Sequence, residues 1–267
     1  APESAEGQAA RRQLAIGVLA LVGLAGSVAI LVRQGVLSVE AGTSAFSWVY
    51  LIVVIAFFTW LFMAGQWTKE ERKRLIVIVV LFAGAAVFWS AFEQAASTLN
   101  LFAAQNTRNS IFGWTFPSSW FQSVNALMII IFAPVFAWIW ISLGKRDPSS
   151  PAKFAFGLVS VGLGFVVMVG AAQASANGVL VSPMWLVLTY LLHTIGELSL
   201  SPVGLSSMTK LAPDRVKGMM MGVWFLAASV GNLIAGGVLR FYADFTLPQV
   251  FGAVAAFAIV AGLVMFA

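Results

Sequence analysis

The chain has 267 residues, of which 60% are hydrophobic and only 9% are charged, and its mean hydropathy is +0.94. Because soluble domains carry about 25% charged residues, this composition excludes an ordinary soluble globular protein. In a soluble protein, a net charge of +5 would suggest nucleic-acid binding. In this chain, membrane topology explains where the basic residues lie.

Apolar runs of about 20 residues predict helices that cross the hydrocarbon core of a bilayer. No stretch has the alternation of about ten residues that a transmembrane β-barrel strand needs. The predicted fold is therefore an all-α, polytopic membrane protein. Eight spans are expected, at 14–32, 46–65, 75–103, 119–143, 154–172, 183–209, 218–240 and 247–267.

The basic residues separate by loop when the start of the chain is placed in the cytoplasm. Only Arg33, Arg108 and Arg240 then lie outside. This asymmetry predicts a cytoplasmic N-terminus by the positive-inside rule and makes a nucleic-acid partner unnecessary. The inside set is Arg11, Arg12, Lys69, Arg72, Lys73, Arg74, Lys145, Arg146, Lys153, Lys210, Arg215 and Lys217.

The two ends of the sequence differ from those of a complete membrane protein. Residues 1–13 are polar and lack the pattern of a signal peptide, which predicts a cytoplasmic linker. Met265–Ala267 stop inside an apolar run, so we expect a fragment that is cut at both ends. Segments 14–32 and 46–65 carry no charge at mid-depth and are expected to face lipid.

Segment 75–103 is long enough to tilt or to extend beyond the membrane. It places Trp89 and Glu93 four residues apart, on one helical face. Segment 119–143 carries Asn125 and, further in, Pro134, where a kink is expected because proline removes a helix hydrogen bond.

Glycines in two later segments predict close contact between helices. Segment 154–172 contains Gly157, Gly162 and Gly164, and the next but one begins with Gly218 and Gly222. Small residues at such spacings allow helix backbones to approach each other.

Segment 183–209 contains an ionisable residue, Glu197, near its middle, followed by Ser201 and Pro202. A carboxylate at this depth costs roughly 2.5–3.5 kcal/mol on insertion scales, so it predicts a functional site. His193 lies one turn earlier, and two interpretations stay open for it. It is either a proton partner of Glu197, or a packed imidazole bonded to a backbone or hydroxyl oxygen.

Glu93 and Glu197 have no basic residue inside the predicted spans to neutralise them. Each therefore needs a proton or a cation from a substrate or from another domain. Together these remedies describe a proton-coupled carrier of positively charged molecules.

Enzyme and metal chemistry find no support in the sequence. There is no cysteine and only one histidine, and the acidic residues do not cluster within a loop. No phosphate loop, dinucleotide fingerprint or nucleophile–base constellation appears. We therefore expect neither an enzyme nor a resident cofactor or metal, with protons as the coupling ion.

The runs FWSAFEQ from Phe88, FQSVNALMIIIFAPVFAW at 121–138 and GELSLSPVGLSSMTKLAP at 196–213 resemble the proton-dependent oligopeptide transporter family of the major facilitator superfamily. The resemblance covers the chain from about residue 75 and implies a six-helix C-terminal half at 75–267, after a loop at 67–74. Residues 14–66 resemble the extra helix pair that bacterial members carry between their halves. The N-terminal six helices, with their E-x-x-E-R-F-x-Y-Y motif, are absent from this sequence.

The resemblance also implies roles for individual residues. Glu197 matches the acid that receives the ammonium group of a peptide, and Asn125 matches an amide beside it. Glu93 matches an acid of proton coupling. Cavity-lining positions are matched by Trp89, Ser201 and Trp224, and gate hinges are expected at Pro134 and Pro202.

The function that this resemblance implies is proton-coupled symport of di- and tripeptides by alternating access in a bacterial inner membrane. The partners would be the peptide, the bilayer and the missing six-helix half. Two alternatives stay open: a carrier of another solute, such as nitrate, a drug-like molecule or an amino-acid derivative, and a nontransporting membrane scaffold.

Overall fold

The computed structural model describes the chain except for residues 1–18, 20–22, 24–25, 28–29, 36–37 and 267. The predicted linker at 1–13 and most of the predicted span at 14–32 therefore lie outside the described residues. The described chain forms two units, 1–61 and 62–267, which we treat separately. Helix α2 (Val39–Ala64), which belongs to the first unit up to residue 61, corresponds to the predicted span at 46–65, and apolar side chains such as Phe46 and Trp48 are exposed on it.

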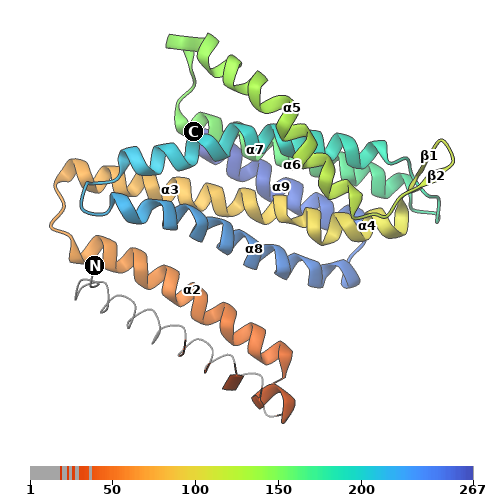
Figure 1. Ribbon diagram of the computed structural model, residues 1–267, viewed down its shortest axis with the longest axis horizontal. Helices are drawn as coiled ribbons and strands as arrows, with labels where there is room; N and C mark the ends of the chain where they lie inside the picture. Colours follow the sequence, from red (N-terminus) through yellow and green to blue (C-terminus); the bar gives the residue numbers. More distant parts are fainter. Residues whose placement is uncertain (1–18, 20–22, 24–25, 28–29, 36–37, 267) are drawn as a thin grey trace, which may run out of the picture. The chain divides into compact units, whose positions relative to one another are not determined.

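The second unit contains the predicted helices and one short hairpin that the sequence did not predict (Figure 1). Seven helical segments of the described chain, α2 included, are long and apolar enough to cross a membrane, which confirms the all-α, polytopic membrane fold. The elements of this unit are α3 (Lys69–Phe92), η1 (Glu93–Ala96), α4 (Thr98–Asn106), β1 (Ser110–Ile111), β2 (Trp114–Thr115), α5 (Trp120–Leu143), η2 (Gly144–Arg146), α6 (Ser150–Ala174), α7 (Met184–Leu211), η3 (Lys217–Met219), α8 (Met220–Asp244) and α9 (Leu247–Phe266).

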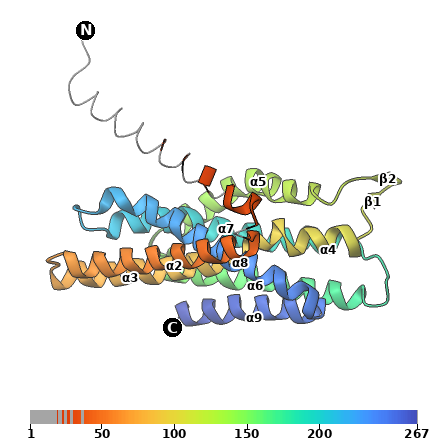
Figure 2. The ribbon, with the colours of Figure 1, turned by 90° about the horizontal axis from the view of Figure 1, so that it is seen from below.

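Helix α6 is at the centre of the packing, with α7 on one side and α9 on the other, while α3 pairs with α8 (Figures 1 and 2). Glycines allow these close approaches. A Cβ atom on Gly157 of α6 would lie 2.9 Å from the carbonyl oxygen of Gly196 of α7. On the other side, a Cβ atom on Gly262 of α9 would lie 2.9 Å from the carbonyl oxygen of Ala155.

The prediction of close contact is thus confirmed for the glycines of α6, and it stays a prediction for Gly218 and Gly222. At each of these two positions an added Cβ atom would meet no described atom within 4 Å. The Gly–Met–Met–Met–Gly spacing is compatible with helix packing, but within the described chain no neighbour lies against either glycine.

The predicted single helix at 75–103 is interrupted, which is a correction to the sequence analysis. Helix α3 ends at Phe92, and a 3-10 turn with Ser97 at φ −118°, ψ −95° separates it from α4. The buried Gln94 side chain explains the break. Its Nε2 group donates to the carbonyl oxygens of Ser90 (3.1 Å) and Ala235 (3.3 Å), and its Oε1 atom accepts from Thr98 (2.9 Å). Side chains that bond the backbone in this way compete with the regular helix ladder.

The hairpin between α4 and α5 pairs Ser110 with Thr115 and Ile111 with Trp114. Its two central residues, Phe112 (φ 51°) and Gly113 (φ 81°), both have positive φ, the pattern of a type I′ turn. A parallel bridge between Thr107 and Val181 joins this connection to the one between α6 and α7.

Phe112 occupies a turn position that favours asparagine, and its side chain is fully exposed, at 106% of the reference area. Because a left-handed conformation costs an ordinary L-residue about 1–2 kcal/mol, we expect Phe112→Asn to preserve or raise the thermal midpoint of the purified protein. Gly113→Ala, the matched control, should lower it, since alanine cannot adopt φ 81° without strain. A loss of stability in Phe112→Asn comparable to that in Gly113→Ala would mean that the phenyl ring makes a stabilising contact outside this chain.

Candidate functional site

Three helices carry the polar side chains that the sequence singled out at membrane depth. Glu197 lies on α7, Asn125 near the start of α5 and Glu93 directly after α3. Helix α7 packs against both α5 and α3, so α7 brings these segments, distant in sequence, near each other.

Glu197 and Asn125 are in direct contact, as part of a hydrogen-bonded chain across α5 and α7. Nδ2 of Asn125 donates to Oε2 of Glu197 at 3.1 Å, and Oγ1 of Thr194 lies 2.6 Å from Oδ1 of Asn125. The Thr194 hydroxyl also lies 2.8 Å from the Tyr190 carbonyl oxygen, so its one proton has two acceptors, of which Oδ1 of Asn125 is the closer. With Oδ1 of Asn125 facing this hydroxyl, the amide N–H groups of Asn125 face Glu197.

Glu93 is half-buried and close enough to the half-buried Glu197 for their negative charges to repel each other. Among the described residues, the Glu93 carboxylate has no hydrogen bond and no ion pair, and only the backbone N–H of Glu93 is bonded, to the carbonyl oxygens of Trp89 and Ala91. Two carboxylates in one site do not readily carry charge together, so the pair favours a state with one proton or one bound cation.

The ion pairs of the second unit lie elsewhere. They join Lys73 to Glu70 at 3.0 Å, Lys153 to Asp147 at 2.7 Å, and Arg215 to Glu71 at 3.9 Å. No described basic side chain pairs with Glu93 or Glu197. Chemically, the site is an acceptor of protons or of a cationic group.

Two further predicted residues place unpaired polar atoms near these acids in the sequence. Nε1 of Trp89, one turn before Glu93, and Oγ of Ser201, one turn after Glu197, are buried and have no partner within the described chain. A buried polar atom without a partner costs about 1–3 kcal/mol, so both atoms are suited to bind a water molecule or a ligand.

The other predicted site residues have different surroundings. Trp224 of α8 is 5% exposed and packs edge-on against Phe154 of α6, where Gly204 of α7 leaves room for its indole ring. Pro134 and Pro202 are exposed, and α5 and α7 continue through them. The hinge role of the prolines and the pocket role of Trp224 stay predictions.

His193 is fully buried and packs against aromatic rings, with its centroid 5.1 Å from that of Phe165 and 6.1 Å from that of Phe92. Its ring interacts with the backbone of Val161, but neither ring nitrogen has a partner at hydrogen-bond geometry within the described chain. Within the described chain no hydrogen bond joins it to Glu197. The imidazole is therefore packed in the core, as one of the two interpretations expected. The hydrogen bond to a backbone or hydroxyl oxygen that this interpretation also expected is not present in the described chain.

Thr194 is the site residue that the sequence analysis missed. It lies three residues before Glu197, a spacing that puts both side chains on one helical face, and this spacing could have indicated Thr194 from the sequence.

The described residues contain no group of three His, Cys, Asp or Glu side chains that could hold a metal ion.

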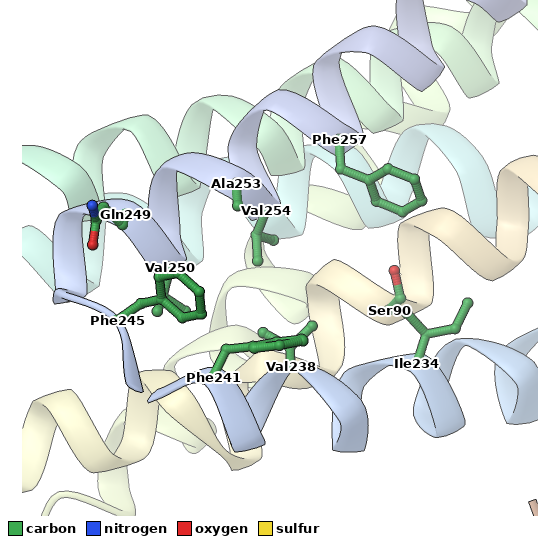
Figure 3. Close-up of a pocket in the computed structure, with 10 residues that line it drawn as sticks. All are labelled: Ser90, Ile234, Val238, Phe241, Phe245, Gln249, Val250, Ala253, Val254 and Phe257. Atoms are coloured by element: carbon green, nitrogen blue, oxygen red, sulfur yellow. The ribbon is translucent and has the colours of Figure 1, made fainter. Parts of the chain in front are cut away.

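The well-formed cavity of this unit lies away from these acids, between α3, α8 and α9 (Figure 3). Its volume is about 470 Å³. Its lining is apolar except for two side chains, and it includes neither Glu93 nor Glu197. The residues that line it are Ser90, Ile234, Val238, Phe241, Phe245, Gln249, Val250, Ala253, Val254 and Phe257.

Comparison with known proteins gives consistent relatives. The chain is 46% identical to the Peptide transporter YePEPT of Yersinia enterocolitica over 225 residues. This alignment covers 82% of this chain and 44% of the relative. It is 33% identical to a Di-/tripeptide transporter of Lactococcus lactis subsp. cremoris, with 80% of this chain and 44% of the relative covered. The chain thus spans less than half the length of these curated relatives.

The fold also matches solved structures of transporters. A crystal structure of peptide transporter POT in complex with sulfate superposes with a TM-score of 0.86 at 39% identity, over 99% of this chain and 53% of that one. A POT family transporter in complex with 5-aminolevulinic acid gives a TM-score of 0.83 at 28% identity, over 99% of this chain and 55% of that one. These relatives and neighbours are named as transporters and not as enzymes.

A family model described as PTR2, the POT family, matches residues 8–257, which is most of the chain. The resemblance inferred from the motifs is confirmed, and the chain belongs to the POT family.

Proposed function

We propose that this chain lines one side of the substrate cavity of a proton-coupled symporter for di- and tripeptides in a bacterial plasma membrane. The observation that most supports this proposal concerns the Glu197 carboxylate. It accepts a hydrogen bond from Asn125, and no described cation neutralises it. The names of the relatives in Yersinia and Lactococcus support peptides as the cargo.

In this proposal, Glu197 binds the ammonium group at the N-terminus of the peptide, and Asn125 keeps the carboxylate oriented for it. A charge-assisted hydrogen bond of this kind contributes about 1.5–3 kcal/mol. Trp89 and Ser201 offer donors to the peptide, and Trp224 shapes a pocket for its side chains.

Glu93 carries the coupling proton, with no resident cofactor or metal. When it is charged, it attracts a cation from the opposite side of the cavity, and when it is protonated it releases that cation. The opposite side belongs to a six-helix half outside this sequence. Rocking of the two halves about a mid-membrane site alternates access, with bending at Pro134 and Pro202. The start of this chain faces the cytoplasm, as the distribution of Lys and Arg indicates.

A second cargo class has one observation in its favour. A structurally similar POT family transporter was solved with 5-aminolevulinic acid, which like a peptide carries an amino group and a carboxyl group. Competition between 5-aminolevulinic acid and dialanine for uptake distinguishes the two cargo classes.

The first test is dialanine transport by the full-length protein in proteoliposomes. We expect Glu93→Gln to abolish uptake driven by an inward proton gradient and to retain exchange at equal pH, because glutamine cannot release a proton. Glu197→Gln should raise the KM by about 10-fold or more in both assays, since it loses a charged hydrogen bond worth at least about 1.5 kcal/mol.

The matched control is Glu70→Gln, which removes an exposed acid paired with Lys73 outside the site. It should transport like the wild type. Wild-type protein that is folded but neither takes up nor exchanges dialanine would exclude the peptide assignment.

The second test concerns Thr194, which orients Asn125. Thr194→Val keeps the side-chain shape but removes the proton donated to Oδ1 of Asn125. Interhelical hydrogen bonds in membranes average about 0.6 kcal/mol and reach about 1.7 kcal/mol, so the KM for dialanine should rise about 3- to 20-fold. Thr194→Ser retains the hydroxyl and should restore the KM. An unchanged KM in Thr194→Val, with reduced stability alone, would limit Thr194 to a structural role.

A further inference from the structure

The cavity between α8, α9 and α3 is elongated along the helices that form its walls (Figure 3). On α8 it extends from Ile234 to Phe241, and on α9 from Gln249 to Phe257. At 1.5 Å per residue these stretches correspond to about 10–12 Å. Both walls are membrane-spanning helices, so the cavity lies along the bilayer normal and not across it.

One end of this cavity is polar and the rest is apolar. Gln249 lies at the end near the α8–α9 connection, and its Oε1 atom accepts from the backbone N–H and the hydroxyl of Thr246, at 3.1 and 2.8 Å. Within the described chain, the Nε2 group of Gln249 has no partner and is available to a ligand. Arg240 is exposed at the same end of α8, with Asp244 one turn further on.

Deeper in the cavity the lining offers almost nothing to a polar ligand. Ile234, Val254 and Phe257 are apolar, and the hydroxyl of Ser90 in the floor already donates to the Val87 carbonyl oxygen at 2.7 Å. A peptide placed here would leave its amide groups without partners, at a cost of at least about 1–3 kcal/mol for each group. The cavity is therefore unsuited to the peptide cargo proposed above.

The cavity is also unsuited to another helix. Helices α8 and α9 contact each other, and both contact α3. A helix about 10 Å wide takes up roughly 900 Å³ over a length of about 12 Å, about twice the cavity volume of about 470 Å³, whereas a single hydrocarbon chain is much thinner. Phe241, Phe245 and Phe257 are each about half exposed and give the opening an apolar rim at membrane depth.

We propose that this cavity binds one acyl chain of a membrane phospholipid. The chain lies against Val238, Val254 and Phe257, and the ester or phosphate oxygens at its polar end accept from Nε2 of Gln249. Arg240 reaches the phosphate level, as long basic side chains near the end of a span do. The bound lipid fills the space between α8 and α9 and covers Ser90, the residue directly after Trp89.

The test uses a phosphatidylglycerol with a photoactivatable acyl chain, reconstituted with the full-length protein and mapped by mass spectrometry after illumination. Wild-type protein should be labelled at residues that line the cavity, on both α8 and α9. Ala253→Trp fills the cavity from α9 and should reduce this labelling at least 5-fold. The matched control is Ala256→Trp, on the same helix and exposed but outside the lining, and it should be labelled like the wild type.

Val238→Trp fills the cavity from the opposite wall and provides a second variant if Ala253→Trp does not fold. Equal labelling in the wild type and in a folded cavity-filling variant would overturn the proposal, because the probe would then report the general lipid surface. Wild-type protein without label inside the cavity would overturn it too, since the space would be closed by protein. Dialanine uptake, measured in parallel, keeps the outcome separate from that of the transport proposal.

Discussion

The second unit depends on one electrostatic constraint: two carboxylates at membrane depth have no described cation beside them. Glu93 and Glu197 repel each other, and only a neutral amide, that of Asn125, bonds to one of them. An amide can orient a carboxylate but cannot neutralise it. The stable states of this site are therefore those in which a proton or a cation is bound.

The packing of the helices keeps this site in place. The contact of Gly157 with Gly196 brings α7 against α6 one residue before Glu197, and the break after α3 leaves Glu93 at a helix end. Gln94 then fixes the broken end to α8 through the Ala235 carbonyl oxygen. The backbone around both acids is thus set by contacts that do not involve the acids, so they can change charge without loss of the surrounding structure.

The membrane helices could be predicted from the sequence because apolar length is a local property. The predicted spans at 119–143 and 154–172, for example, correspond closely to α5 and α6. Asn125, Glu93 and Glu197 could be singled out for the same reason, since a polar side chain inside an apolar run is visible without a fold. The motif resemblance added their expected roles, which stay predictions.

Features that depend on distant partners could not be predicted in this way. The interruption of the helix at Glu93–Ala96 rests on a hydrogen bond from Gln94 to a residue 141 positions away. Gly218 and Gly222 have the spacing of a packing motif but no described neighbour, whereas the equally small Gly157 and Gly196 meet backbone to backbone. Spacing alone does not distinguish these cases, because it describes one helix and packing requires two.

Helix α3 also separates two chemically different environments. Glu93, one turn after Trp89, interacts electrostatically with Glu197, while Ser90, the next residue after Trp89, lies in the floor of the apolar cavity. Adjacent residues on a helix are about 100° apart, so a single turn can face a site for a charged substrate and a site for a hydrocarbon chain. Gly231 of α8 lies against the backbone of Ala86 and Ser90 on α3, too close to admit a Cβ atom, so the two helices pack backbone to backbone at this point. A ligand in the apolar cavity would touch α3, which ends directly before Glu93, through Ser90.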